Sequence, residues 1–251
     1  MGNFSRRKMI AAGIGATAGA GGLALAASIA GRYGLIPPDD GGLYGAGEAL
    51  TYAAQRLLTR HSMAREFSRS QITAPFANGA PPTDDEFRRL QAGGFADWRL
   101  AVDGMVARPA SFSLAELKSY PSRSQITHLA CEEGWSFIAE WTGVPLAHVL
   151  NVVGILPQAK YVAYFSIERG WWDSLDMADA LHPQTFLTYG MNGGELPPGH
   201  GGPLRMRVPR QLGYKNVKYI TRLTVTDSLK SFGKGLGSAS PEAGYAWYAG
   251  I

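Results

Sequence analysis

Residues 127–144 read Thr-His-Leu-Ala-Cys-Glu-Glu-Gly-Trp-Ser-Phe-Ile-Ala-Glu-Trp-Thr-Gly-Val and contain the only cysteine of the chain, Cys131. A single thiol cannot form an intramolecular disulfide, so it fills the core, attacks a substrate or binds a soft metal. Free cysteine is among the most buried residue types, which favours the core. The adjacent Glu132 and Glu133 are costly neighbours for an inert buried thiol. Because carboxylates are useful where protons or a cation are handled, Cys131 is a candidate functional residue.

A second informative block runs from residue 200 to residue 218. It begins His-Gly-Gly-Pro-Leu-Arg-Met-Arg-Val-Pro and ends Lys-Asn-Val-Lys. The two glycines allow a backbone to approach a ligand closely, and the planar fork of Arg205 suits a phosphate group. Alternation with apolar residues predicts a strand on which Arg205 and Arg207 share one face. From these residues alone, a phosphate cradle and a solvated basic face of an exposed sheet are both open.

The run Cys-Glu-Glu-Gly-Trp-Ser at 131–136, followed by Glu-Trp-Thr-Gly-Val-Pro-Leu at 140–146, resembles the active-site segment of the sulfite-oxidase-type molybdopterin oxidoreductases. The run 200–218 is similar to the cofactor-binding segment of the same family. The resemblance extends from about Trp98 to the C-terminus, and it is greatest to the exported bacterial branch that includes periplasmic methionine-sulfoxide reductases. It implies a sulfite-oxidase-like α+β fold, β-rich with short peripheral helices, and a molybdenum–molybdopterin cofactor.

The resemblance also implies a set of site residues. Cys131 is implied to be the metal ligand, and Glu133 is a candidate catalytic acid near the metal. His200 departs from the pattern, because the reductase branch carries asparagine there, and a histidine makes this contact pH-dependent. In the upstream loop His61 is as good a candidate for the cofactor contact as its neighbour Ser62. The residues implied to bind the cofactor are Ser62, Arg65, Glu66, Cys131, Ser166, His200, Arg205, Asn216, Val217 and Lys218.

The chain starts with an export pattern. Residues 5–10 read Ser-Arg-Arg-Lys-Met-Ile, a twin-arginine motif, and residues 9–31 are uncharged and rich in glycine, alanine and aliphatic side chains. Small residues near Ala26 and Ala30 suit a cleavage site. The alternative is a permanent membrane helix, since about 20 apolar residues span a bilayer core. We expect a periplasmic protein that the twin-arginine machinery exports already folded, with residual membrane attachment if the signal stays uncleaved.

Length and composition indicate how the chain is organised. Residues 1–35 are assigned to the export signal and the start of a linker, and the remainder suits one large domain or two small ones. We expect an N-terminal extension with helices at 36–95 and a molybdopterin-binding domain at 96–251. Apolar residues make up 45% of the sequence and charged residues 18%, so a packed core is expected. A net charge of +4 without a basic stripe gives no support for a nucleic acid partner.

Local patterns predict short helices scattered among strands. Apolar spacing predicts a helix within 48–67, capping boxes at 83–86 and 113–116 predict helix starts, and Gly154 ends a helix that begins at Pro145. Strands are expected at 98–106, 161–167, 185–189, 204–208 and 217–227, with a tight turn at 192–194. The pattern lacks the regular strand–helix alternation of a doubly wound sheet, which favours an α+β domain.

Taken with the resemblance, these features predict a two-electron oxygen-atom transfer at an oxo-molybdenum centre, on a small S-oxide or N-oxide substrate. Sulfite oxidation with the same cofactor is the alternative, although a small dianion calls for arginines and Cys131 is flanked by carboxylates. A cysteine-dependent hydrolase with His128 or His200 as base and a zinc module built on His128 and Cys131 are alternatives from other classes. The sequence has no haem or iron–sulfur cysteine motif, so a separate electron donor is expected, such as a membrane haem protein.

Overall fold

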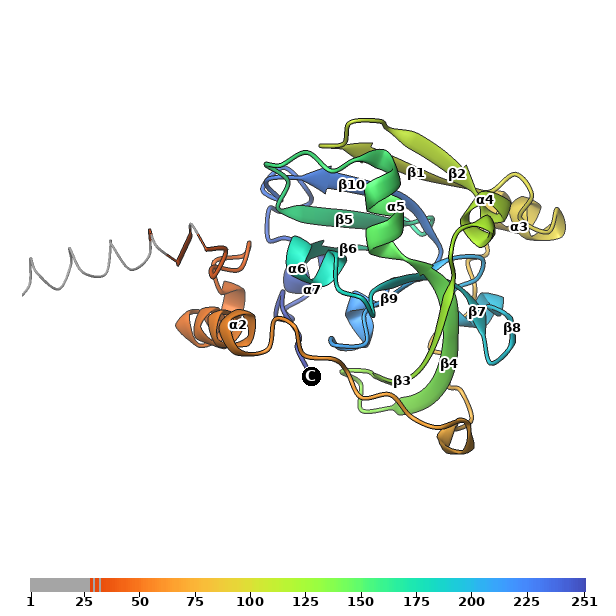
Figure 1. Ribbon diagram of the computed structural model, residues 1–251, viewed down its shortest axis with the longest axis horizontal. Coiled ribbons are helices and arrows are strands. Elements are labelled where there is room, and N and C mark those ends of the chain that lie inside the picture. Colours follow the sequence, from red (N-terminus) through yellow and green to blue (C-terminus); the bar gives the residue numbers. More distant parts are fainter. Residues whose placement is uncertain (1–27, 29, 32) are drawn as a thin grey trace, which may run out of the picture.

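The structure, a computed structural model, describes residues 28, 30, 31 and 33–251 (Figure 1). The twin-arginine motif with Arg6 and Arg7 lies outside these residues. Among the helices that the structure does describe, none is both long and apolar enough to cross a membrane. The proposed division of the chain after residues 35 and 95 stays a prediction.

The described elements are short. The helices are η1 (Gly42–Tyr44), α2 (Ala46–Leu58), η2 (Arg69–Gln71), α3 (Asp85–Ala92), α4 (Leu114–Ser119), α5 (Leu146–Val153), α6 (Met177–Ala180), η3 (Pro198–His200), η4 (Gly213–Lys215) and α7 (Ala239–Glu242). The strands are β1 (Arg99–Gly104), β2 (Ala110–Ser113), β3 (Arg123–Ala130), β4 (Ser136–Pro145), β5 (Tyr161–Ser166), β6 (Trp172–Asp176), β7 (Phe186–Met191), β8 (Gly194–Glu195), β9 (Arg205–Arg207) and β10 (Ile220–Thr226).

Two five-stranded sheets form the body of the protein. The first has the strand order β2-β1-β10-β5-β6, in which β1 and β10 run parallel and the other neighbours run antiparallel. The second has the order β3-β4-β7-β8, and β9 pairs with β7. Sheets of this kind with short helices around them belong to the α+β class that the sequence predicts.

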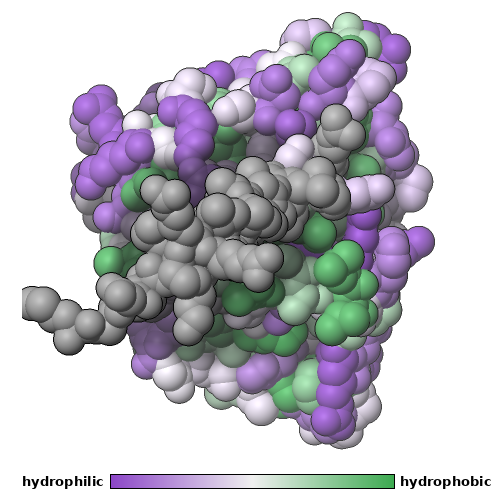
Figure 2. All heavy atoms as spheres, turned by 90° about the vertical axis from the view of Figure 1, so that its left-hand side faces the viewer, coloured by the Kyte–Doolittle hydropathy of each residue, from purple (hydrophilic) through white to green (hydrophobic). Residues whose placement is uncertain are grey.

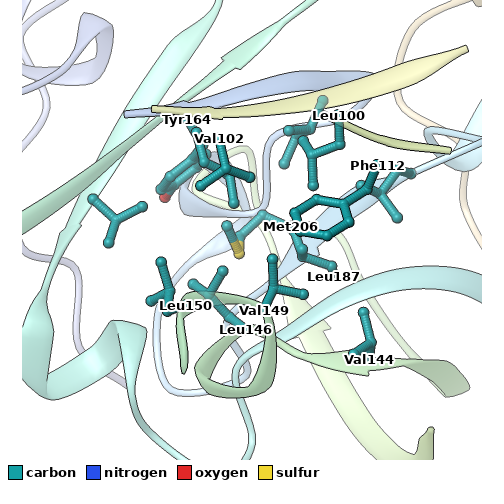
Figure 3. Packing of buried hydrophobic residues seen from close by; sticks show 14 of the residues in the cluster. Leu100, Val102, Phe112, Val144, Leu146, Val149, Leu150, Tyr164, Leu187 and Met206 are labelled. Atoms are coloured by element: carbon teal, nitrogen blue, oxygen red, sulfur yellow. The ribbon is translucent and has the colours of Figure 1, made fainter. Parts of the chain in front are cut away.

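The main core lies between the first sheet and α5 (Figure 3). Leu146, Val149 and Leu150 follow the helical spacing of one face, are fully buried, and point toward Leu100 and Tyr164 of the first sheet. Burying an aliphatic side chain of this size contributes roughly 1.5–3 kcal/mol. This packing holds the first sheet against the second, whose strands β3, β4 and β9 carry the two sequence blocks described above.

Most local predictions are confirmed. Ser113 and Glu116 form the predicted capping box of α4, and the turn after β7 has Asn192 and Gly193 at φ angles of 50° and 83°. Helix α3 starts one residue later than expected, because Asp84 is the N-cap and accepts a hydrogen bond from the Phe87 N–H. Pro145 precedes α5 as its N-cap and is not its first helical residue.

Helix α2 begins at Ala46, two residues before the predicted range 48–67, and ends at Leu58. Its buried side chains are Glu48, Tyr52 and Arg56, and its leucines, Leu50, Leu57 and Leu58, are exposed. After α2 an extended segment passes along β3 toward α3 (Figure 1). The Phe67 N–H donates to the Ile126 carbonyl of β3. The N-terminal extension is therefore attached to the sheet that carries the cysteine segment.

Candidate active site

Cys131 opens the turn between β3 and β4. These strands pair from Arg123↔Gly143 to Ala130↔Ser136, so the position of the turn is fixed by a long antiparallel ladder. The Cys131 N–H donates to the Trp135 carbonyl at 3.0 Å, and the Gly134 N–H donates to the Cys131 carbonyl at 3.1 Å. Gly134 has a φ of 90°, a backbone conformation that favours glycine. The sequence Cys-Glu-Glu-Gly-Trp thus builds a tight turn that holds the thiol in place.

The thiol faces a cavity of about 410 Å³. Walls come from the β3–β4 turn, the end of β5, β9, the loop at 213–219, the C-terminal segment and a loop that precedes α3. The lining residues are Asn78, Gly79, Ala80, Cys131, Glu132, Glu133, Trp135, Ser166, Glu168, Trp171, Arg205, Gly213, Tyr214, Asn216, Val217, Lys218, Tyr219, Ala239, Ser240, Ala243 and Tyr245. Segments far apart in sequence therefore converge on Cys131.

Two carboxylates lie next to the thiol. The Cys131 Sγ is 3.2 Å from the Glu132 Oε2 and 3.9 Å from the Glu133 Oε2. Burial and the hydrogen bond with Glu132 raise the pKa of the thiol to about 12. A thiol of this kind is a poor nucleophile on its own, whereas a bound cation would deprotonate it. The described residues lining the cavity include no histidine, so the hydrolase arrangement with His128 or His200 is not formed.

Glu133 is held in a fixed position at the cavity wall. Its Oε2 accepts hydrogen bonds from the Trp135 Nε1–H at 2.7 Å and from the Asn78 side-chain amide at 2.9 Å. Asn78 belongs to the loop before α3, and its backbone carbonyl accepts a hydrogen bond from the Lys218 ammonium. One residue of the N-terminal extension therefore connects the candidate acid with the basic side of the cavity.

The arginines of β9 are buried and lie on the same face of the strand. Arg205 is 4% exposed and Arg207 is 0% exposed, so the solvated basic face considered from the sequence is wrong. Neither forms an ion pair with a carboxylate among the described residues. Burial lowers the pKa of Arg205 to about 10 and also lowers the pKa of Arg207. Two buried cations without an anionic partner indicate a site for a negatively charged group.

Backbone and amide oxygens orient these cations. Arg205 donates from Nε and Nη2 to the Asn216 carbonyl at 3.2 and 3.0 Å, and from Nη1 to the His200 carbonyl at 2.9 Å. Arg207 donates to the Asn216 Oδ1 at 2.8 Å and to the His128 carbonyl at 2.5 Å. Arg207 thereby links the cofactor loop to β3, the strand that leads into the cysteine turn.

Lys218 adds a third cation to the cavity. Its ammonium donates to the Gly199 carbonyl at 2.8 Å, and burial lowers its pKa to about 8. Gly201 permits this approach, because a Cβ there would lie 2.9 Å from the Cβ of Lys218. Gly213 has the same role beside the thiol, since its Cβ would lie 3.2 Å from the Cα of Cys131. The loop at 213–218 can therefore reach both the cysteine turn and β9.

The structure gathers most of the predicted site residues. Those that line the cavity are Cys131, Glu133, Ser166, Arg205, Asn216, Val217 and Lys218. His200 lies behind it: its ring packs edge-on against Phe137 at 5.8 Å, and it reaches the site through the carbonyl that binds Arg205. Burial lowers the pKa of His200.

Ser62, Arg65 and Glu66 do not line this cavity. Glu66 pairs with Thr127 of β3 and accepts a hydrogen bond from the Gln184 side chain at 3.1 Å. It lines a second, smaller cavity of about 260 Å³ with Gln125 and Gln184. Arg65 stacks on Phe67, with its guanidinium carbon 4.8 Å from the ring centroid. Their assignment to cofactor binding stays a prediction.

Sequence reasoning missed several residues of the site. Trp135 belongs to the cysteine motif, and the turn brings its indole N–H to the carboxylate of Glu133, two residues earlier. Arg207 was recognised as the neighbour of Arg205, but its complete burial has no local signal. Asn78 and Tyr245 come from irregular segments far apart in the chain, where composition carries no information about the site.

The residues present fit a molybdopterin cofactor. A pterin that carries a phosphate and a metal-binding dithiolene is strongly anionic, and the cavity supplies Arg205 and Lys218 with Arg207 behind them. The Nε of Arg207 is buried and has no hydrogen-bond partner among the residues that the structure describes. In the same cavity Cys131 offers a soft sulfur ligand, which suits a soft metal centre. The described residues contain no group of three or more His, Cys, Asp and Glu side chains arranged to hold a metal, so no zinc cluster forms there.

The comparisons with known proteins agree with this geometry. A family model described as the oxidoreductase molybdopterin-binding domain matches residues 89–231. The chain is 41% identical over 194 residues to a protein of Azospira oryzae named "Putative protein-methionine-sulfoxide reductase subunit YedZ1", with 77% of this chain and 70% of that protein covered. It is 37% identical over 147 residues to the protein-methionine-sulfoxide reductase catalytic subunit MsrP of Xanthomonas axonopodis pv. citri, with 53% of this chain and 46% of that protein covered.

Among solved structures, the chain is similar to the sulfane dehydrogenase SoxCD of Paracoccus pantotrophus, with a TM-score of 0.52 and 25% identity over 54% of this chain and 40% of that chain. The chain spans about half the length of the MsrP protein and of the SoxCD chain, and more of the Azospira protein. These matches confirm the family, the fold and the cofactor predicted from the cysteine and arginine blocks. The chain belongs to the oxidoreductase molybdopterin-binding family and is a molybdopterin-dependent oxidoreductase.

Proposed function

We propose that this oxidoreductase reduces an S-oxide in the periplasm, with Cys131 as the protein ligand of molybdenum. The observation that carries the proposal is that the thiol of Cys131, the buried Arg205 of β9 and Lys218 border one cavity. A soft ligand and an anion-binding surface in the same cavity are the two features that a molybdopterin requires. When bound, the cofactor supplies a metal centre that exchanges an oxygen atom and two electrons.

The residues of the chain have distinct roles in this proposal. Arg205 and Lys218 hold the anionic part of the cofactor, and Arg207 and Asn216 keep Arg205 in position through the hydrogen bonds described above. Reduction of an S-oxide to a sulfide consumes two electrons and two protons and releases water. Glu133, fixed by Trp135 and Asn78, is placed to deliver a proton at the cavity wall.

The surroundings of the thiol favour a neutral substrate over sulfite. Glu132 and Glu133 lie within 4 Å of the Cys131 sulfur, and their charges would repel a small dianion. Aromatic side chains form much of the remaining wall, namely Trp135, Trp171, Tyr214 and Tyr245. Trp171 is 61% exposed, so the cavity is apolar near its mouth. An apolar sulfoxide fits these walls better than sulfite does.

Electrons come from another protein in this proposal. The chain has one cysteine, and that cysteine is assigned to molybdenum, so no cysteine remains for an iron–sulfur or c-type haem centre. The relatives are named as a subunit and as a catalytic subunit, which supports a partner for this chain as well. A membrane haem protein of the periplasmic face is the proposed donor, and the twin-arginine motif supports the proposed location.

The decisive experiment is an assay of the purified, molybdenum-containing protein in both directions. With a reduced viologen as donor, we expect reduction of methionine sulfoxide or dimethyl sulfoxide and formation of one sulfide for every two electrons consumed. With ferricyanide as acceptor, we expect little oxidation of sulfite. Preferential sulfite oxidation would reverse the proposed direction, and S-oxide reduction that persists in protein lacking molybdenum would remove the cofactor from the reaction.

A further inference from the structure

The outward face of α2 is apolar, which is unusual for a helix packed on a soluble domain. The side chains of Leu50, Leu57 and Leu58 are 71%, 68% and 81% exposed. Glu48 and Arg56, the charged residues of the helix, are buried on the opposite face. The helix is amphipathic, but its polar face points into the protein and its apolar face points away from it.

The apolar surface extends beyond the helix. Leu43 and Tyr44, just before α2, are 81% and 57% exposed, and Tyr33 and Met63 flank this region at 76% and 56%. Seven of the thirteen exposed large hydrophobic residues in the described part of the chain thus fall within residues 33–63. We call Leu43, Tyr44, Leu50, Leu57 and Leu58 the α2 face. Figure 2 looks onto this end of the molecule, where apolar side chains gather in several patches.

Buried polar contacts fix the rotation of α2. Arg56 forms ion pairs of 2.7 Å with Asp176 and 2.6 Å with Asp179, at 5% side-chain exposure. The Tyr52 hydroxyl donates to Asp176 at 2.8 Å. Breaking a buried pair of this kind costs roughly 3–5 kcal/mol, so the helix cannot turn its leucines inward. Contiguous exposed apolar residues in such a locked position indicate a contact surface.

We propose that the α2 face docks onto the surface of a lipid bilayer. Residues 9–31, which precede it, contain no charged side chain and lie between Arg6-Arg7-Lys8 and Arg32. A segment of this composition that enters a membrane leaves Arg32 and Tyr33 at the lipid surface, where basic and tyrosine side chains are enriched. Helix α2 begins 14 residues after Arg32, which allows at most about 50 Å of extended chain.

The charges around the α2 face also suit a lipid surface. Within residues 33–63 the exposed charged side chains are Asp40 and Arg60, and His61 is exposed beside Arg60. The exposed carboxylate of this segment, Asp40, forms an ion pair of 3.1 Å with the ammonium of Lys230. Arg60 lies two residues after the end of α2. An apolar helix face with a basic residue nearby and no unpaired exposed carboxylate within residues 33–63 matches helices that lie in the interface of anionic membranes.

This inference does not rest on the proposed reaction and can be tested separately. A protease site is inserted between Gly34 and Leu35, and the full chain is bound to vesicles of phosphatidylglycerol and phosphatidylcholine and then cut. The test variant is Leu50→Ser with Leu57→Ser and Leu58→Ser. The control variant is Leu156→Ser with Leu181→Ser, because these leucines are 37% and 43% exposed elsewhere on the surface. Equal melting temperatures establish that both variants are folded.

After cutting, the wild-type body and the control are expected to sediment with the vesicles, and the test variant is expected to partition at least tenfold more weakly. Equal release of all three bodies overturns the proposal. Retention that requires a co-reconstituted membrane protein also overturns it, in favour of a protein partner. Hydrogen exchange of residues 43–58 in the uncut chain is the second measurement. Slower exchange of these amides only when vesicles are present supports the lipid contact. Equally slow exchange without vesicles overturns the proposal, because the chain's own N-terminal run then covers the face.

Discussion

Arg205 and Arg207 lie side by side on β9, with their guanidinium carbons 5.6 and 5.1 Å from the ring centroid of Trp141. Burial and the neighbouring charge of Arg205 together lower the pKa of Arg207. Such a pair is unfavourable without an anion and favourable beside one. The protein without cofactor therefore carries a cost that molybdopterin removes when it binds.

The first prediction concerns Arg207→Met. Removing one buried charge should reduce the stabilisation that the cofactor provides, because a hydrogen-bonded charge contributes about 1.5–3 kcal/mol. Cofactor loading raises the melting temperature of the wild type, and this rise should be several degrees smaller in Arg207→Met. The conversion is roughly 2–4 °C per kcal/mol for a chain of this size. Arg207→Lys, which keeps the charge, is the control. An unchanged difference in Arg207→Met would show that this charge does not act on the cofactor.

Cys131→Ser should abolish turnover and leave a folded protein. Serine has a similar volume but offers a hard oxygen in place of a soft sulfur, so the electronic properties of the metal change. Circular dichroism, molybdenum content and viologen-linked S-oxide reduction are measured together. Activity within a few-fold of the wild type would rule out the proposed ligand.

Glu133→Gln should lower kcat by about 100-fold, within the range for a lost proton donor, while molybdenum content stays the same. Glutamine keeps an oxygen that can accept the Trp135 hydrogen bond, so the turn is preserved. The control is Glu132→Gln, which alters the carboxylate nearest the thiol without touching Asn78 or Trp135. If both variants lose activity equally, general electrostatics near the thiol and not proton delivery by Glu133 explains the effect.

Glu48→Gln should raise stability at neutral pH. Burial and the neighbouring Asp39 raise the pKa of Glu48 above its usual 4.5, and one oxygen of each carboxylate is buried without a hydrogen-bond partner. A carboxyl with a raised folded-state pKa stabilises the fold at low pH, and this contribution is lost as pH rises through that pKa. Glutamine keeps an acceptor for the Trp247 N–H and cannot ionise.

Stability of Glu48→Gln and of the wild type is measured by denaturant unfolding between pH 4 and pH 8. The gain is expected on the order of 1 kcal/mol at pH 7, the size of one unsatisfied buried polar group, and it should shrink toward pH 4. Glu242→Gln is the control, because the carboxylate of Glu242 accepts a hydrogen bond from the Lys234 N–H in an exposed contact. A gain that does not depend on pH would exclude ionisation of Glu48 as its cause.

The double change Arg6→Lys, Arg7→Lys should prevent delivery to the periplasm, because a receptor reads the twin-arginine motif. If the cofactor is inserted before export, the retained protein should already contain molybdenum. Cell fractionation with metal analysis measures both properties. Periplasmic delivery of the variant would exclude the export assignment, and a retained but metal-free protein would exclude loading before transport.

Local sequence determined those features whose partners are near in the chain. The capping box of α4, the turn at Asn192 and Gly193, and the apolar spacing of α5 involve residues a few positions apart, so the pattern alone specified them. The cysteine turn is also local, since Cys131, Gly134 and Trp135 close it by their own backbone hydrogen bonds. The family resemblance of these short runs was enough to indicate the fold and the cofactor.

Only the tertiary structure decided which face of α2 is buried and which arginines are shielded from solvent. Periodicity revealed a helix, but it cannot distinguish an inward from an outward apolar face when the polar residues find buried partners. Arg56 is buried because Asp176 and Asp179, more than a hundred residues away, supply two carboxylates. Arg207 is buried because β3 and the loop at Asn216 close over β9. Such contacts depend on the packing of distant strands, and no window of sequence contains both partners.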